Sequence, residues 1–263
     1  MLIILLLFGV VLIALLAYYK KKLTFSGAIT AVVVGSLISI GLGLFGLLLL
    51  GAFFFSSMII GSIASSKKDL GIVDKGQRRD ATQVLANGGV SAIIAIVYFI
   101  FPSELFICGF VASLAAANSD TWASEIGVHS KQLPLHLIEW TRVPPGTSGA
   151  ITILGSIAAF AGSLFIVIFS IFLWSGTFSS IYVSLIILTL AGFLGNLFDT
   201  VLGGVWQVVY RCSQCSIETE RRFHCNKKTI QIKGKSWMNN DFVNFGCTSF
   251  GAIIGILAAW LFL

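Results

Sequence analysis

The run FSGAITAVVVGSLISIGLGLFGLLLLGAFFFSSMIIGSIASS, at residues 25–66, decides the fold of this chain because it contains no charged residue. A helix that crosses the hydrocarbon core of a membrane needs about 20 apolar residues, so the run is too long for one crossing. We therefore divide it near Gly41 and Gly43 and expect two membrane-spanning helices from it.

The rest of the chain has the same apolar character. Of its 263 residues, 57% are hydrophobic and only 11% are charged, and the mean hydropathy is +0.96. No soluble domain of this size would expose such a surface, and the sequence lacks the ten-residue alternation of membrane barrel strands. We expect an all-α, multi-pass membrane protein that forms a single membrane domain over residues 1–263.

Eight membrane-spanning helices account for the apolar runs. The first, at residues 1–18, lacks a basic start and precedes three lysines, so we expect a retained span rather than a cleaved secretory signal. Besides the two helices of residues 25–66, spans are expected at residues 81–101, 105–117, 150–173, 178–198 and 242–263.

The charged residues divide between the loops in a way that supports eight spans. All 17 Lys and Arg residues fall in the loops after the first, third, fifth and seventh spans, and of the 11 acidic residues only Glu104 lies on the opposite side. Because basic loops stay in the cytoplasm, both termini should lie on the non-cytoplasmic side of the cell membrane. The net charge of +6 reflects this orientation, and no nucleic-acid partner is expected.

The polar stretch NSDTWASEIG, at residues 118–127, follows an apolar run and is the centre of the expected site. On a helix, Asp120 and Ser124 share a face, as do Thr121 and Glu125, because each pair is four residues apart. Such an oxygen-rich corner suits Mg²⁺, which prefers one or two carboxylates, waters and substrate phosphates. The alternative is a helix N-cap at this point, with Glu125 as a solvated acid.

A second polar motif, at residues 74–89, leads into the fourth span. If the chain is helical from Asp80, then Asp80, Gln83, Asn87 and Ser91 form one polar stripe that enters the membrane. Hydrogen bonding between neighbouring helices is the alternative explanation of the stripe. We choose Arg78 or Arg79 to neutralise a bound phosphate, on grounds of charge and position, and include Lys75 and Asn87 among the phosphate-binding candidates.

Two further motifs end or begin spans on the same face. In RVPPGTSG, at residues 142–149, prolines, glycines, hydroxyls and free N–H groups precede a helix, which favours an anion site at its N-terminus; a turn with a cap is the alternative. In GNLFDTVLGG, at residues 195–204, Asp199 supplies another membrane-border carboxylate. The last span begins with Asp241, Asn244 and Thr248 on one stripe.

The long basic loop at residues 203–240 is a cytoplasmic insertion that carries its own cluster. CSQC, at residues 212–215, is followed by His224 and Cys225. Cys212, Cys215, His224 and Cys225 could form a tetrahedral zinc site, and unligated cytosolic thiols are the alternative. Cys108 and Cys247 lie within apolar runs, so a disulfide scaffold is not expected.

The shared face of these motifs favours a phosphate site bridged by a cation beside the lipid. Phosphoryl transfer requires carboxylates that hold a metal ion, N–H groups and basic side chains that bind phosphate, and in-line positioning. An apolar acceptor could approach such a site laterally between the spans.

Taken together, the motifs resemble those of a known family of integral membrane proteins, which contains plant plastid phytyl-phosphate kinase and animal transmembrane protein 19. The resemblance covers nearly the whole chain after the first span. It rests on the strings RRDATQVLANGG, NSDTWASEIG, VPPGTSGAIT, FDTVLGG, YRCSQC, ERRFHC and NNDFVNF. The pattern of residues 120–127 is also similar to that of CTP-dependent prenol kinases, such as dolichol and phytol kinases.

The resemblance implies a nucleoside triphosphate donor and a polyprenyl acceptor. It places Asp120, Thr121, Ser124 and Glu125 at the metal and nucleotide phosphates, and Asp80 and Asp199 at the polar centre. It also implies a phosphate loop of Pro145, Gly146 and Thr147, to which we add Ser148. The candidate magnesium ligands are Asp120, Glu125 and Asp199, and the candidate catalytic residues are Asp120, Asp80, Asp199 and Arg79.

The resulting hypothesis is a kinase that converts a prenyl monophosphate, such as phytyl or geranylgeranyl phosphate, into the diphosphate with CTP and Mg²⁺ at the cytoplasmic border. Two alternatives stay open: a cytidylyl- or phospho-alcohol transferase at the same site, and a cation-coupled transporter. A transporter should carry polar groups near the membrane midplane. The expected partners are the prenyl phosphate, the nucleotide and membrane lipids, with a homodimer as an open question.

Overall fold

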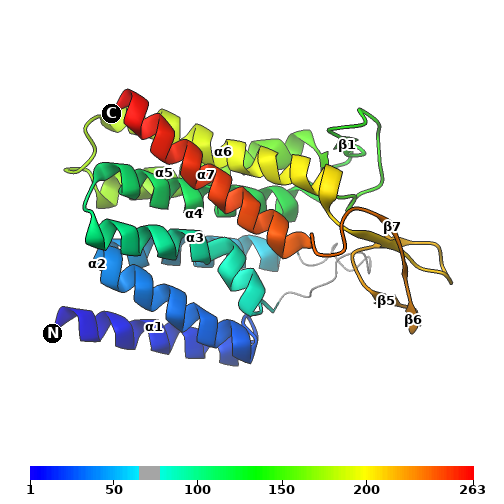
Figure 1. Ribbon diagram of the computed structural model, residues 1–263, viewed down its shortest axis with the longest axis horizontal. Helices are drawn as coiled ribbons and strands as arrows, with labels where there is room; N and C mark the ends of the chain where they lie inside the picture. Colours follow the sequence, from blue (N-terminus) through cyan, green and yellow to red (C-terminus); the bar gives the residue numbers. More distant parts are fainter. Residues whose placement is uncertain (65–77) are drawn as a thin grey trace.

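The computed structural model describes residues 1–64 and 78–263. This part of the chain contains seven helices (Figure 1). They are α1 (Leu2–Tyr19), α2 (Phe25–Ala64), α3 (Ala81–Ile100), α4 (Glu104–Gly127), α5 (Ile153–Leu173), α6 (Ile181–Trp206) and α7 (Asn240–Phe262). All of them except α4, whose last turns are polar, are long and apolar enough to cross a membrane. The expected helical membrane protein is confirmed, while the number of crossings stays a prediction.

The chain reverses direction inside α2. Gly43 has φ +60° and ψ −144°, a backbone conformation that glycine adopts without steric cost. Gly27 packs against the backbone oxygen of Arg79, and Phe53 lies under the Arg79 guanidinium group. In one straight helix Gly27 and Phe53 would be about 39 Å apart, so the two halves of α2 run back to back. The expected division near Gly41 and Gly43 is therefore confirmed.

α4 is the central helix of the bundle. Every residue from Ile107 to Ser119 is buried, and α4 packs against α2, α3, α5, α6 and α7. Small residues permit this close approach: a Cβ atom added to Gly192 of α6 would meet Ala115, and one added to Gly251 of α7 would meet Ala116. Close packing of small residues is a main source of helix association in membranes.

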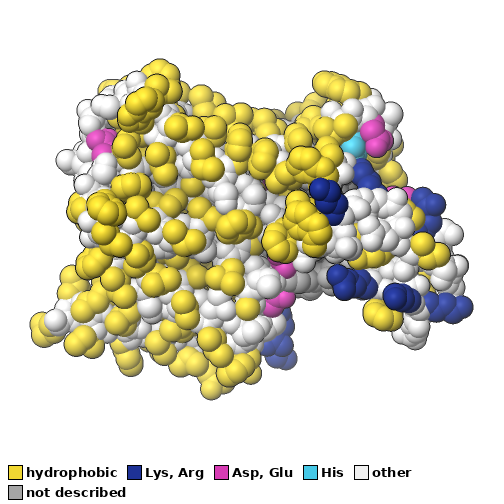
Figure 2. All heavy atoms as spheres, in the orientation of Figure 1, with side chains coloured by type: hydrophobic (Ala, Val, Ile, Leu, Met, Phe, Trp, Pro, Cys, Tyr) yellow, Lys and Arg dark blue, Asp and Glu magenta, His cyan; other side chains and the backbone are white. Residues whose placement is uncertain are grey.

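One end of the bundle is polar and the other is apolar. Both chain termini lie at the left end in Figure 1, and the strands lie at the right end. Figure 2 shows hydrophobic side chains over the helices and Lys and Arg side chains gathered at the end that carries the strands. This distribution agrees with the charge pattern of the sequence. The side of the membrane on which each end lies stays a prediction.

Short β-strands occupy the loops at the polar end, which the sequence analysis did not predict. β1 (Leu135–His136) pairs antiparallel with β2 (Ala150–Ile151). Between α6 and α7, β3 (Val209–Arg211), β4 (Glu218–Thr219) and β7 (Ile230–Lys233) form a three-stranded sheet in the order β4-β3-β7, and β5 (Phe223–His224) pairs with β6 (Lys227–Lys228). The chain remains mostly helical, as expected.

Candidate functional site

Asp120 lies in the last turns of the central helix, at its polar end. α4 begins far upstream, where the Ser103 hydroxyl accepts a hydrogen bond from Leu105 N, so a helix N-cap at residues 119–121 is excluded. The stretch at residues 118–127 stays helical, with the Thr121 hydroxyl bonded back to Ala117 O at 2.9 Å. Asp120 is half-buried, and its Oδ1 accepts a 3.2 Å hydrogen bond from the side-chain amide of Asn196 on α6.

Asp199 lies three residues after Asn196 on α6, and therefore on the same side of that helix. Asn244 of α7, with its amide oriented to donate, lies 3.3 Å from Asp199 Oδ1 and 3.2 Å from Asn240 O. Asp120 and Glu220 are close enough for their negative charges to act on Asp199. Three helices thus bring carboxylates and amides together where the bundle meets the strands.

Asp80 caps the N-terminus of α3. Its side chain accepts a hydrogen bond from Gln83 N, and the Gln83 side chain accepts one from Asp80 N, which together form a capping box. The Thr82 hydroxyl lies 2.9 Å from Asp80 Oδ1 and 2.7 Å from Oδ2 of Asp241, a buried residue of α7. Thr82 therefore joins the capped end of α3 to α7 at the polar end, next to Asp80, the first residue of the expected polar stripe.

Glu125 and Arg79 lie on another side of α4. Five residues separate Asp120 from Glu125, which turns their side chains about 140° apart around the helix. Glu125 lies beside Gly61 of α2 and interacts electrostatically with Arg79. Burial lowers the pKa of the Arg79 guanidinium group and Glu125 partly offsets this effect, while Arg78 donates to Leu23 O at 3.2 Å. Arg79, rather than Arg78, is thus the arginine directed toward an acidic residue of the site.

The loop at residues 144–149 differs from the expected opening of a helix. β2 follows it, and α5 begins only after Thr152, whose hydroxyl accepts a hydrogen bond from Gly155 N. The helix N-terminus is therefore capped by Thr152, three residues after the loop ends. Gly149 has φ +85° and packs on the backbone of Gly204 in α6, an approach that only glycine permits.

Two hydrogen bonds connect this loop to the carboxylate of Glu220. The Ser148 hydroxyl donates to Gln207 Oε1 at 2.6 Å, and Gln207 Nε2 donates to Glu220 Oε1 at 2.7 Å. Gln207 is buried, and Glu220 acts electrostatically on Asp199. Neither Gln207 nor Glu220 was predicted from the sequence, because nothing local indicates that Gln207 contacts Ser148, 59 positions away, or that Glu220 lies near Asp199.

A buried histidine lies against the same loop. His136 is 2% exposed, and its Nδ1 accepts a hydrogen bond from Glu139 N. Nε2 has no hydrogen-bond partner among the described residues, and it lies beside Gly149 and Gly204. His136 was not predicted as a site residue either, since a single histidine in a two-residue strand forms no sequence pattern.

Several other candidates bond within their own segment. The Ser124 hydroxyl donates to Thr121 O, the Asn87 amide to Gln83 O, and the Thr147 hydroxyl to Pro144 O, next to Pro145 and Gly146 in the exposed turn. Asn196 is a hydrogen-bond partner of Asp120. From the motif at residues 195–204, only Asp199 was predicted as a site residue. Lys75 lies outside the described residues.

The four predicted zinc ligands lie together at the far end of the segment between α6 and α7. The ligand atoms of Cys212, Cys215, His224 and Cys225 all lie within 4.8 Å of one another. Within residues 1–64 and 78–263, this is the only group of three or more His, Cys, Asp or Glu side chains that converges so closely. The carboxylates of the polar end would instead need substrate phosphates or water to complete the coordination of a metal ion.

Comparison with known proteins gives matches over most of the chain. The family described as integral membrane protein DUF92 matches residues 8–252. An uncharacterised membrane protein of Methanocaldococcus jannaschii is 30% identical over 252 residues, which cover 95% of this chain and 92% of that protein. Two Arabidopsis thaliana proteins are also similar. Protein PGR is 29% identical over 89% of this chain and 88% of PGR. Chloroplastic protein VTE6 is 27% identical over 89% of this chain and 65% of VTE6. No solved structure matches.

Proposed function

We propose that this chain, which belongs to the DUF92 family of integral membrane proteins, transfers the terminal phosphoryl group of CTP to a prenyl monophosphate at its polar end. Membership of an integral membrane family, expected from the motifs, is confirmed by the match over residues 8–252. The donor and the acceptor follow from the resemblance of the motifs to those of phytyl-phosphate and prenol kinases. The similarity to a chloroplastic plant protein is compatible with an acceptor of this class.

The observation that supports the proposal is the link from Ser148 toward Asp199 and Asp120. Hydrogen bonds join Ser148 to Gln207 and Gln207 to Glu220, and the charges of Glu220 and Asp120 both act on Asp199. The loop that we propose to bind phosphate is thereby linked to the carboxylates that we propose to bind its counter-ion. In phosphoryl transfer the protein contributes mainly positioning and charge stabilisation, so this pair of elements is what the reaction requires.

Asp120 and Asp199 suit Mg²⁺. They project from neighbouring helices, their charges act on each other, and each is bonded to a neutral amide, Asn196 or Asn244, which does not compensate the carboxylate charge. Carboxylates placed this close repel each other, and a divalent cation would offset the repulsion. When bound, Mg²⁺ would neutralise charge that develops on the β- and γ-phosphates. Glu125 is less suited to the same ion because it points away from Asp120.

In the proposed step, an oxygen of the prenyl monophosphate attacks the γ-phosphorus of CTP. A new P–O bond forms, the bond between the γ-phosphorus and the β,γ-bridging oxygen breaks, and CDP leaves. The attacking oxygen is already anionic, so no strong general base is required. Arg79 would bind the acceptor phosphate from the side of Glu125, while residues 144–149 would bind the nucleotide phosphates. Asp80 would act as a positioning residue through the cap of α3.

The prenyl chain would stay in the bilayer. The apolar outer surfaces of the helices continue up to the polar end, where acidic side chains are visible beside the basic segment (Figure 2). An acceptor with a charged head and an apolar tail can therefore remain in the membrane while its phosphate reaches Asp120. A water-soluble acceptor would not require a site beside the bilayer.

The test is a donor panel on the purified full-length chain. Geranylgeranyl phosphate or phytyl phosphate is supplied with Mg²⁺ and one of CTP, ATP, GTP or UTP. Prenyl diphosphate and nucleoside diphosphate should form in equal amounts, fastest with CTP. Release of pyrophosphate or CMP would instead indicate a cytidylyl- or phospho-alcohol transferase, and no product with any donor would exclude the kinase.

A further inference from the structure

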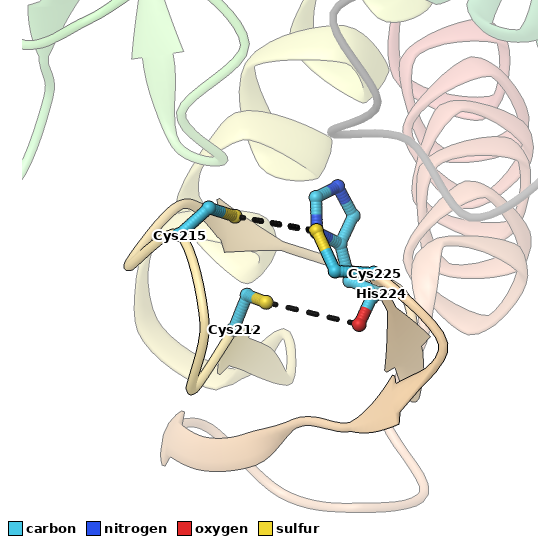
Figure 3. A group of neighbouring side chains, drawn as sticks. All are labelled: Cys212, Cys215, His224 and Cys225. Atoms are coloured by element: carbon cyan, nitrogen blue, oxygen red, sulfur yellow. Dashed lines mark hydrogen bonds between the residues drawn. The ribbon is translucent and has the colours of Figure 1, made fainter.

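The cluster of Cys212, Cys215, His224 and Cys225 has the dimensions of an occupied tetrahedral metal site (Figure 3). Cys215 Sγ lies 3.8 Å from Cys225 Sγ, and His224 Nδ1 lies 3.4 Å from Cys215 Sγ and 3.2 Å from Cys225 Sγ. Tetrahedral zinc with bonds of about 2.3 Å to sulfur and about 2.0 Å to nitrogen separates two sulfurs by about 3.8 Å, and sulfur from nitrogen by about 3.5 Å. The three spacings among Cys215, His224 and Cys225 therefore match zinc, and Cys212 Sγ lies within 4.8 Å of the other ligand atoms.

The turn that carries Cys212 and Cys215 is built to hold a thiolate. Gln214 N donates to Cys212 Sγ at 3.4 Å, and Ser216 N donates to Cys212 O at 3.0 Å. The Cys212 thiol also lies 3.7 Å from the backbone oxygen of His224. Zinc binds the thiolate form of cysteine, and the N–H group of Gln214 is placed to stabilise that form at Cys212.

The turn that carries His224 and Cys225 holds two non-glycine residues in the left-handed region. Cys225 has φ +50° and Asn226 has φ +58°, and together they form the two-residue turn between β5 and β6. A turn of this type normally contains Asn-Gly or Gly-Gly, because a residue with a Cβ atom is disfavoured there by about 1 kcal/mol or more. The turn brings the side chains of the adjacent residues His224 and Cys225 into the same cluster of four ligand atoms. Their adjacency in the sequence did not by itself predict this arrangement.

We propose that Cys212, Cys215, His224 and Cys225 bind one zinc ion. Four protein ligands leave no open coordination position, so the ion is structural rather than catalytic. Zinc binds cysteine as the thiolate, so binding of the ion releases the thiol protons. Strands of two to four residues between α6 and α7 have little apolar core of their own, and zinc supplies the stability that they lack.

The ion would also hold Glu220 in position through the neighbouring strands. The role of Glu220 in catalysis rests on the proposed function. Cys212 directly follows β3, Cys215 precedes β4, and Glu220 follows β4. Glu220 accepts the hydrogen bond from Gln207, which in turn accepts one from Ser148. Loss of zinc should therefore loosen the connection between the loop at residues 144–149 and Asp199, without any metal ligand touching the substrate.

The test measures the metal directly. The full-length chain is produced in zinc-supplemented medium, purified through a tag without histidines and without chelators, and analysed by plasma mass spectrometry. We expect about one zinc per chain, and at least a tenfold lower content in Cys212→Ser and Cys225→Ser. Ser213→Ala in the same turn and Cys247→Ser in α7 are matched controls that should keep the zinc. Equal zinc in all variants, or none in the natural chain, would overturn the proposal.

A second measurement needs no substitution. Cys215 and Cys225 are exposed, so free thiols at these positions should react at once with N-ethylmaleimide. In the natural chain they should react only after a chelator removes the zinc. Immediate reaction, or a Cys215–Cys225 disulfide found by peptide mass spectrometry, would contradict the site. Because neither readout depends on catalysis, an inactive protein that binds zinc would refute only the proposed kinase function.

Discussion

Asn196 Nδ2 donates a hydrogen bond of 3.2 Å to Asp120 Oδ1 and thereby joins α6 to the last turns of the central helix. Asp120 is therefore held in position by a neutral partner, which fixes one carboxylate oxygen and preserves the negative charge. Asp199 lies one turn further along α6, within electrostatic range of Asp120. These features make the polar end of α4 and α6 the centre of the proposed phosphoryl transfer.

The hydrogen bond between Ser148 and Gln207 should couple the loop to the carboxylates. Ser148→Ala and Gln207→Leu should each lower kcat/KM, because each interrupts the connection to Glu220. The double variant should be little worse than either single one, with an interaction energy of about 0.5–3 kcal/mol. A double-mutant cycle on kcat/KM measures this coupling. Independent, fully additive effects would show that the contact has no role in the reaction.

Asp80 should tolerate loss of its charge but not loss of its cap. Asp80→Asn keeps an oxygen that can accept from Gln83 N, so its activity should stay within about threefold of the natural chain. Asp80→Ala removes the cap and should lower the free energy of unfolding by about 1 kcal/mol. Thermal unfolding and initial rates of both variants provide the comparison. A rate for Asp80→Asn as low as that expected of a lost catalytic carboxylate would contradict the positioning role.

Gly43 should be required for its backbone conformation alone. A Cβ atom added at Gly43 or at Gly51 meets nothing within 4 Å, but only Gly43 has a positive φ. Gly43→Ala should therefore destabilise the chain by about 1–3 kcal/mol, because φ +60° with ψ −144° lies close to a region that is essentially restricted to glycine. Gly51→Ala should be neutral or stabilising by up to about 1 kcal/mol, since alanine favours a helix. The unfolding temperatures of the two variants in detergent test this difference; equal shifts would argue against a strained reversal.

The loops of the polar end should lie on one side of the membrane. In a chain whose exposed cysteines have been replaced, Lys20→Cys and Gln132→Cys should react with a membrane-impermeant maleimide from the cytoplasmic side only. Ser175→Cys, in the turn between α5 and α6, should react from the other side only. Labelling of intact cells and of inverted vesicles makes the comparison. Labelling of Lys20→Cys and Gln132→Cys from opposite sides would disprove the eight-span topology.

The helical framework could be predicted from the sequence because it depends on local properties. Long apolar runs, glycines at a break and basic loops directly determine where a chain can cross a membrane. The division near Gly43 was predicted for this reason. The strands were not, because pairs such as β1 and β2 contain two residues each and show no periodicity. A helix through residues 118–127 was one of two interpretations of the sequence, and the extent of α4 decides for it over a new N-cap at this point.

The candidate site could be predicted in part. Asp120 and Asp199 stood out because carboxylates at the border of an apolar run are costly unless they have a role. Gln207 and Glu220 could not be found, since their importance arises from contacts across the fold with Ser148 and Asp199. The cysteine cluster could be predicted only in part. Its sequence spacing suggested zinc, but the left-handed turn at Cys225 was needed to explain how adjacent His and Cys residues can bind the same ion.

The most direct test of the account follows the label from CTP carrying ³²P in its γ-phosphate, with geranylgeranyl phosphate as acceptor and the full-length chain in liposomes. The natural chain should transfer the label to prenyl diphosphate in a Mg²⁺-dependent reaction. Asp120→Asn should be slower by at least about 100-fold. Glu104→Gln, at the opposite end of α4 beside Ser179, should retain the natural rate. Transfer that proceeds undiminished in Asp120→Asn, or no labelled prenyl diphosphate from the natural chain, would contradict the account.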